Sequence, residues 1–109
     1  MAHRKLRTFD HYRYGPRGVL VPGDRFRVRG GPVYVTSEGR NIPMYERGVF
    51  VFRAYCVLGA RRWIEAYRAD GGGIVILSVG KAHRSRVVPN LRCRPYRVVG
   101  KLRDPAAAK

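Results

Sequence analysis

Acidic residues are scarce in this sequence. Seven Asp and Glu stand against 23 Lys and Arg, which gives a formal net charge of +16. No two of the acids have a spacing that suggests the paired groups used in general acid–base catalysis. A charge so far from zero destabilises a compact chain by self-repulsion, and a polyanionic partner relieves it. The scarcity therefore argues against an enzyme and favours nucleic acid as a partner.

Cysteine and histidine are also few. The two cysteines, Cys56 and Cys93, lack the CxxC spacing of a zinc site, and His3, His11 and His83 are scattered. We therefore expect two reduced thiols, no metal and no cofactor. A nucleophilic pair of Cys93 with His83 is the one alternative to the simpler interpretation of Cys93 as a small buried hydrophobe.

Long apolar runs are missing as well. No stretch approaches the roughly 20 apolar residues of a membrane span. The basic N-terminus has no apolar run after it, so it does not resemble a secretory signal. We expect a cytoplasmic protein with no membrane partner.

The 109 residues, 45% of them hydrophobic, suffice for one small folded domain. Residues 1–20 are rich in Arg, Lys, His and Tyr without a sustained period, which predicts a basic flexible arm. Residues 21–103 are the predicted domain, and 104–109, with "PAAAK", are a predicted disordered tail.

Five segments within this domain have the composition or alternation of β-strands. They are residues 25–29, 48–58, 61–69, 74–79 and 94–102. A helix over 60–69 is an alternative, but the tight turns on both sides favour a strand. Segment 74–79 is apolar on both faces, so we expect it at the centre of the sheet.

The connections complete the expected topology. "LGA" (58–60) and "DGGG" (70–73) are tight turns, so the second, third and fourth strands form a meander. The long link between the first two strands contains a small hairpin with Glu38 and Gly39 near its tip. The basic link 80–93 is a candidate for a short helical turn.

This order of strands resembles an SH3-like small β-barrel, and "GDRFRVRGG" is similar to the opening strand of a KOW-type motif. The resemblance implies an all-β fold: a five-stranded SH3-like barrel with a long first loop and a basic N-terminal arm. It implies no binding residues, because such barrels serve many functions.

Alternation along the first predicted strand places Arg25, Arg27 and Arg29 on one face and Phe26 and Val28 on the other. A row of guanidinium groups can neutralise phosphates and release counterions. Aromatic side chains near such a row can stack on unpaired bases. We therefore interpret the row as a phosphate-contacting strip.

Other basic and aromatic residues extend this hypothesis. The predicted nucleic-acid-binding residues are Arg25, Arg27, Arg29, Arg53, Arg61, Arg62, Trp63, Tyr67, Lys81, Arg84 and Arg86. The arm would add Arg4, Lys5, Arg7, Arg13 and Arg17 with Tyr12 and Tyr14. Two alternatives stay open: the arginines form a solvated face, and Trp63 and Tyr67 form a second core face.

The sequence thus predicts a nucleic-acid-binding protein that acts mainly through the phosphate backbone. DNA is slightly favoured over RNA because no aromatic motif of the RNA-recognition type is present. A protein-interaction module is the alternative, with Tyr34, Met44 and Tyr45 in a groove for an acidic partner. A third hypothesis is a ribosome-associated or phage-type structural protein. The oligomeric state is left open.

Overall fold

The computed structural model describes residues 5–84 and 87–103, and these residues form strands, turns and loops without a helix. The chain is therefore all-β, as expected. Within the described residues, no helix is long and apolar enough to cross a membrane. The strands are β1 (Arg7–Phe9), β2 (Tyr12–Gly15), β3 (Gly18–Leu20), β4 (Arg25–Gly30), β5 (Val33–Val35), β6 (Asn41–Pro43), β7 (Phe50–Leu58), β8 (Arg61–Arg68), β9 (Ile74–Ser78), β10 (His83–Arg84), β11 (Leu91–Cys93) and β12 (Tyr96–Lys101).

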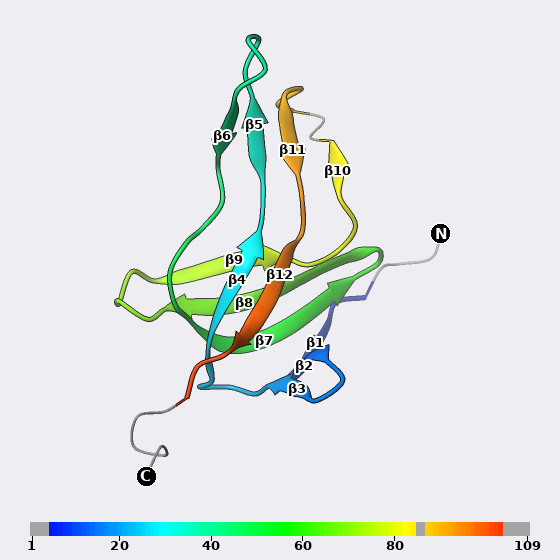
Figure 1. Ribbon diagram of the computed structural model, residues 1–109. Coiled ribbons are helices and arrows are strands. Elements are labelled where there is room, and N and C mark those ends of the chain that lie inside the picture. Colours follow the sequence, from blue (N-terminus) through cyan, green and yellow to red (C-terminus); the bar gives the residue numbers. More distant parts are fainter. Residues whose placement is uncertain (1–4, 85–86, 104–109) are drawn as a thin grey trace.

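The main sheet has the order β12-β4-β7-β8-β9, and β1 adds to β7 beside this path. All its neighbouring strands are antiparallel. Strands β7, β8 and β9 form the expected meander, and the expected strand over 61–69 is confirmed against the helical alternative. The last strand, β12, returns to pair with β4 (Figure 1).

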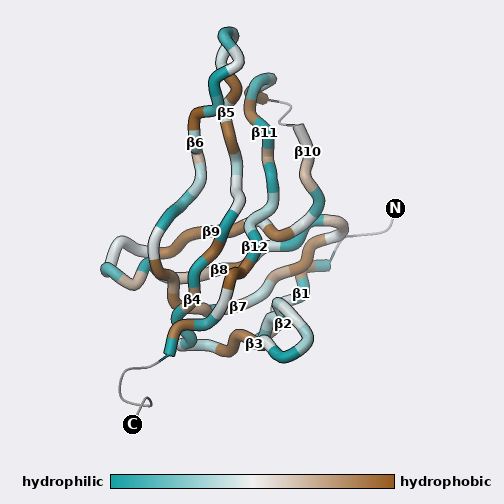
Figure 2. The backbone as a smooth tube through the Cα atoms, viewed as in Figure 1, coloured by the Kyte–Doolittle hydropathy of each residue, from teal (hydrophilic) through white to brown (hydrophobic). Residues whose placement is uncertain are grey.

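The core lies on one face of this sheet. Phe26, Phe50, Phe52, Ile64 and Leu77 are almost completely buried. They come from β4, β7, β8 and β9 and alternate with more exposed neighbours, as the two-residue period of strands requires. Figure 2 shows hydrophobic segments along β7, β8 and β9. Burial of these side chains is the main stabilising contribution of the domain.

A second sheet projects from the main sheet as a finger, with the order β10-β11-β5-β6 (Figure 1). Its β5–β6 hairpin is the one expected from the sequence. The tip is closed by a backbone hydrogen bond from the Thr36 amide to the Arg40 carbonyl (2.8 Å), and the Arg40 amide donates to Thr36 Oγ1 (3.0 Å). The helical turn considered for 80–93 was wrong where the structure describes it, because this link supplies β10 and β11 to the finger.

The described part of the predicted arm contains strands that the sequence analysis did not expect. Strand β1 pairs with β7, with Thr8 opposite Cys56, and β2 and β3 form a hairpin of their own. Each of these strands has only three or four residues, too few to show a period in the sequence. Residues 1–4 of the arm and the tail 104–109 lie outside the described residues.

Strand β9 is not central, so the expected position of segment 74–79 was wrong. It lies at the end of the main sheet's strand order, beside β8. Val75 and Leu77 face the core, whereas Ile74 and Ile76 on the other face are 52% and 56% exposed. The exposed isoleucines make β9 apolar on both faces in the sequence, which is the pattern typical of a central strand buried on both sides.

Two glycines mark the junction of the main sheet and the finger. Gly30 and Gly31 have φ values of 83° and 101°, in the left-handed region that favours glycine. A Cβ atom on Gly31 would lie 2.5 Å from the Cβ of Tyr45 and 2.7 Å from the ring of Tyr96. The chain can therefore turn from β4 into β5 against these two tyrosines only because no side chain intervenes.

Candidate nucleic-acid interface

The arginine row of β4 has the predicted arrangement. Arg25, Arg27 and Arg29 are all exposed, whereas Phe26 is fully buried and Val28 is partly buried. The pattern arises because the apolar pair anchors β4 to the core and leaves the opposite face to the guanidinium groups. The three charges therefore point to one side of the sheet.

Strand β12 adds a fourth arginine that the sequence analysis missed. Arg97 lies directly opposite Arg29 in the β12–β4 register, and Gly100 lies opposite Arg27. We call Arg25, Arg27, Arg29 and Arg97 the arginine strip. Alternation along β12, with Tyr96 and Val98 buried, could have revealed Arg97.

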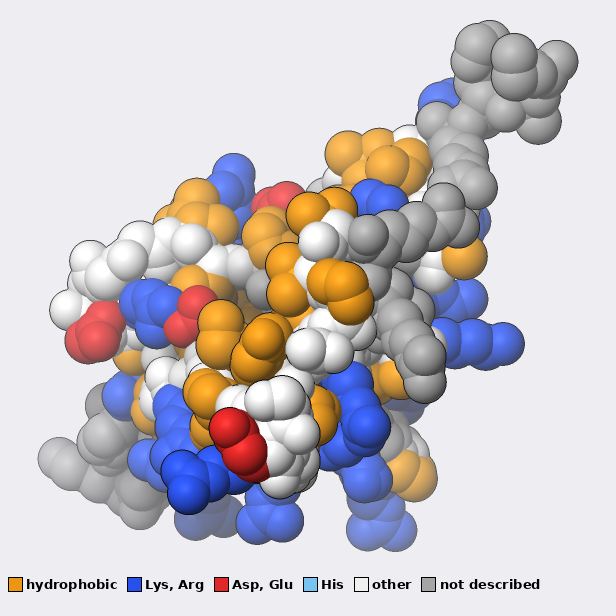
Figure 3. Space-filling model, turned by 90° about the horizontal axis from the view of Figure 1, so that it is seen from above, with side chains coloured by type: hydrophobic (Ala, Val, Ile, Leu, Met, Phe, Trp, Pro, Cys, Tyr) orange, Lys and Arg blue, Asp and Glu red, His pale blue; other side chains and the backbone are white. Residues whose placement is uncertain are grey.

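No described acid pairs with the strip. The salt bridges within the described residues join His11 to Asp10, Arg68 to Glu46 and Lys101 to Asp24. In the view from above, Lys and Arg side chains are most numerous along the lower and right-hand edges of the molecule, and acidic side chains are few (Figure 3). The strip is thus a concentrated positive field without internal compensation.

The strip continues into an aromatic and apolar surface on the same side of the sheet. The registers place Arg25, Val51, Tyr67 and Ile74 in one row across β4, β7, β8 and β9. Tyr67 is 42% exposed, which excludes the core interpretation for this residue. The Arg53 guanidinium lies 5.8 Å from the centre of the Tyr67 ring, a cation–π geometry.

The remaining predicted residues lie elsewhere. Arg61 and Arg62 are exposed at the start of β8, about 16–20 Å along the strand from Tyr67 at a rise of about 3.3 Å per residue. Trp63 is partly buried between Cys56 and Ser78 in the register. Lys81 is exposed in the link that follows β9. The predicted set therefore divides into the strip with Arg53 and Tyr67, and a second group near the start of β8.

The side chains of two predicted residues in the basic link lie outside the described part of the structure. Arg84 belongs to β10, where its backbone lies opposite Arg92, but its side chain lies outside the described part. Arg86 lies outside the described residues altogether. Their part in the predicted interface stays a prediction.

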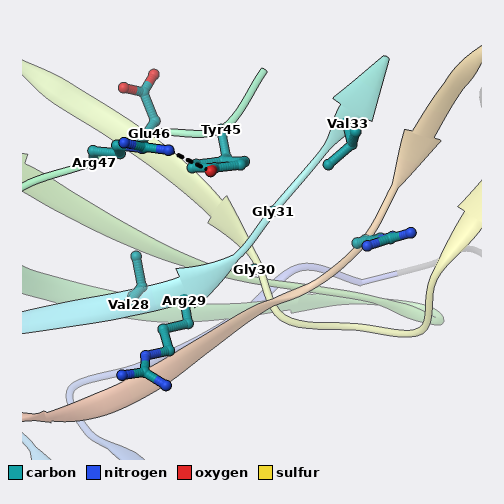
Figure 4. Close-up of a pocket in the computed structure, with 9 residues that line it drawn as sticks. Val28, Arg29, Gly30, Gly31, Val33, Tyr45, Glu46 and Arg47 are labelled. Carbon is teal, nitrogen blue, oxygen red and sulfur yellow. Dashed lines mark hydrogen bonds between the residues drawn. The ribbon is translucent and has the colours of Figure 1, made fainter. Parts of the chain in front are cut away.

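A cavity of about 330 Å³ lies at the junction of β4 and the finger. Its lining includes Arg29 of the strip together with Arg47, Arg94 and Tyr45. Figure 4 shows Val28 and Arg29 leaving β4 in opposite directions, and Tyr45 and Arg47 beside the Gly30–Gly31 turn. Three guanidinium groups from three separate segments therefore border one hollow together with Glu46, whose carboxylate pairs with Arg68. Guanidinium groups of this kind can bind an anion.

The tyrosines of this junction hold the link 44–49 in place. The Arg47 guanidinium donates to the Tyr45 hydroxyl (2.6 Å) and lies 4.9 Å from the centre of its ring. The Glu46 amide donates to the Tyr96 hydroxyl (2.8 Å), and Arg68 pairs with the Glu46 carboxylate. Burial raises the pKa of Tyr96, so its hydroxyl stays neutral as the acceptor of this bond.

The two cysteines differ. Cys93 is only partly buried and lies opposite His83 in the β10–β11 register, but the His83 side chain lies outside the described part, so that pair stays a prediction. Cys56 gives no sign of a nucleophile. Cys56 is buried, and it lies opposite Thr8 of β1. Burial is the main cause that raises the pKa of its thiol, and the Glu65 carboxylate raises it further, whereas a hydrogen bond with Thr8 lowers it by less. A thiol with a raised pKa is a poor nucleophile. Across the described ranges, no three His, Cys, Asp or Glu side chains are grouped so that they could hold a metal ion.

Sequence reasoning missed Arg47, Arg94 and Arg97, and it named Tyr45 only for the alternative of a protein-interaction groove. Arg47 and Arg94 lie outside the strands, so no period in the sequence marks them. They line the same cavity as Arg29 because the chain turns from β4 into the finger at Gly30 and Gly31.

No protein-family model, no curated protein and no solved structure matches this chain. We therefore argue its function from its own side chains.

Proposed function

We propose that this protein binds nucleic acid mainly through the phosphate backbone, and that the arginine strip is the principal contact surface. DNA stays slightly favoured over RNA, on the sequence argument alone. Arg53 and Tyr67, beside the strip, belong to the same surface. The SH3-like architecture is part of the proposal: β4, β7, β8, β9 and β12 correspond to the five expected strands, and the pairing of the last with the first supports this.

The observation that carries the proposal is the strip's lack of compensation. Four arginines project from two paired strands, two of them directly opposite each other, without an acid among their described partners. Like charges opposite each other in a sheet are destabilising. A polyanion would relieve this repulsion, and its phosphates would find donors at strand spacing.

Binding to a labelled random duplex and a labelled single strand, measured by fluorescence anisotropy at about 50 and 200 mM salt, tests the function. Four phosphate contacts predict a loss of affinity of about 100-fold across this range. Micromolar or tighter binding with this salt dependence supports the proposal. Absence of binding to both probes at the lower salt contradicts it.

A protein-interaction module is the second candidate, because one observation favours it. Ile42 of β6 and Met44 are exposed near Tyr45 on the finger, and they offer apolar contacts to a partner. An acidic protein would suit the surrounding arginines. In that case Met44→Ser would abolish binding to the partner with little salt dependence, whereas changes to the arginine strip would matter less.

A further inference from the structure

A second cavity, of about 500 Å³, lies between the N-terminal strands and the ends of β7 and β8. It is distinct from the arginine strip and from the cavity at the finger. The residues that line it are Phe9, His11, Tyr12, Arg13, Val19, Tyr55, Arg62 and Val79. Its size is within the range of small-ligand sites, about 300–1,000 Å³.

Three aromatic rings form one wall of this cavity. The rings of Tyr12 and Tyr55 have centroids 4.9 Å apart, and Phe9 lies 5.9 Å from Tyr55. All three side chains are only partly buried, so part of their surface is open to a ligand. Such rings offer flat apolar faces to another flat ring.

The charges around the rings select the kind of ligand. Arg13 and Arg62 line the cavity, and no acid does. Asp10, which precedes the lining residue His11, lies 3.1 Å from the His11 ring nitrogen. A methylated ammonium would be repelled by the two guanidinium groups, because the aromatic cages that bind such cations have electron-rich walls without nearby positive charge. A ligand that combines a flat ring with an anion fits both features.

The Tyr12 hydroxyl adds a hydrogen-bonding group. Burial and the neighbouring Tyr55 raise the pKa of Tyr12, against a smaller opposing effect of Arg62. The hydroxyl is therefore protonated at neutral pH and can donate to a ring nitrogen or carbonyl. The cavity thus combines aromatic faces, a neutral donor and two guanidinium groups.

We propose that this cavity holds one unpaired nucleotide of a single strand, with the base against Tyr12, Tyr55 and Phe9 and the flanking phosphates on Arg13 and Arg62. The inference rests on the proposed nucleic-acid function and deepens it. The bases of an intact duplex are stacked and cannot enter such a cavity, whereas those of a single strand can. The cavity therefore gives the protein a preference for single-stranded segments that the arginine strip alone does not supply.

The test compares two labelled single strands of about 12 nucleotides, one with thymine bases and one abasic, because the abasic strand keeps the phosphates and removes the rings. The wild-type protein is expected to bind the thymine strand about 5- to 100-fold more tightly than the abasic strand. Tyr12→Leu, which keeps most of the apolar volume, removes this preference and leaves binding to the abasic strand unchanged. Tyr12→Phe keeps the stacking face and loses only the hydroxyl donor, so it retains most of the preference.

Tyr34→Leu on the finger is the matched control and keeps the wild-type preference; circular dichroism verifies that each variant is folded. Arg62→Gln is a second variant that leaves the rings in place, and it weakens binding to the thymine strand. Equal wild-type affinity for both strands, or a preference that survives Tyr12→Leu, overturns the inference while salt-dependent duplex binding still supports the proposed function. Absence of binding to every probe overturns both.

Discussion

At the scale of residues, the most informative pair is Arg29 and Arg97. Directly opposite positions on neighbouring antiparallel strands place side chains within contact range, so two guanidinium groups there repel each other. Nothing in the described core requires arginine at either position, because both side chains are exposed. We interpret the pair as a cost in stability that is retained for binding.

This interpretation predicts opposite effects of one substitution. Arg97→Thr replaces a charge with a residue suited to strands, so the free energy of unfolding rises by about 0.2–1 kcal/mol. The affinity for nucleic acid falls at the same time, because one phosphate contact is lost. Urea denaturation at low salt measures the first effect, and anisotropy the second.

High salt is the internal control for this substitution. Screening at about 1 M salt shortens the Debye length to about 3 Å, so the stability gain disappears there if repulsion is its cause. A gain that persists in high salt would point to strand propensity instead, and a loss of stability would refute the repulsion.

At the scale of elements, the junction between β4 and the finger decides where the basic side chains meet. Gly31 approaches Tyr45 and Tyr96 so closely that a Cβ atom has no room there. Tyr96 in turn anchors the link 44–49 through the Glu46 amide. The shape of the cavity that Arg29, Arg47 and Arg94 line therefore depends on the absence of a side chain at Gly31.

Gly31→Ala is expected to destabilise the protein by about 2–4 kcal/mol, because it combines a positive φ with overpacking. Gly39→Ala is the matched control: its φ is also positive, at 82°, but a Cβ atom there meets nothing within 4 Å. We expect this control to cost about 1 kcal/mol. Urea midpoints of the two variants compare the effects, and equal losses would contradict the role of packing at Gly31.

The elements also show what the sequence could and could not predict. Alternation identified β4 and its exposed arginines, and the glycine-rich turns identified the meander. The short strands β1, β2, β3, β10 and β11 escaped prediction because each has too few residues to show a period of its own. Two of them, β1 and β11, also depend on pairing with strands distant in the sequence. The edge position of β9 escaped because its outer face is apolar, as a central strand's would be.

The candidate site was predictable to the same extent. The arginines of β4 follow from a local pattern, so the sequence located them, and the same pattern on β12 marks Arg97. The cavity that Arg29, Arg47 and Arg94 share depends on the turn of the chain at Gly30 and Gly31. The ring cluster of Phe9, Tyr12 and Tyr55 likewise joins segments more than forty positions apart, which no local pattern reveals.

At the scale of the whole molecule, the net charge of +16 is the property that the account must explain. The described acids that form salt bridges pair with residues outside the strip: Glu46 with Arg68, Asp10 with His11, and Asp24, which directly precedes Arg25, with Lys101. The positive charge is therefore concentrated where a polyanion can reach it. We therefore expect counterion release to contribute more to the binding free energy than shape complementarity between the protein and the nucleic acid.

The most direct test of this claim is the salt slope of duplex binding for the triple variant Arg25→Gln, Arg27→Gln, Arg29→Gln. Each phosphate contact contributes about 0.9 to the slope of log affinity against log salt, so loss of three contacts lowers its magnitude by about 2.7. Arg40→Gln at the finger tip is the control and leaves the slope unchanged. A triple variant with the wild-type slope would contradict the account, because the phosphates would then lie elsewhere on the protein.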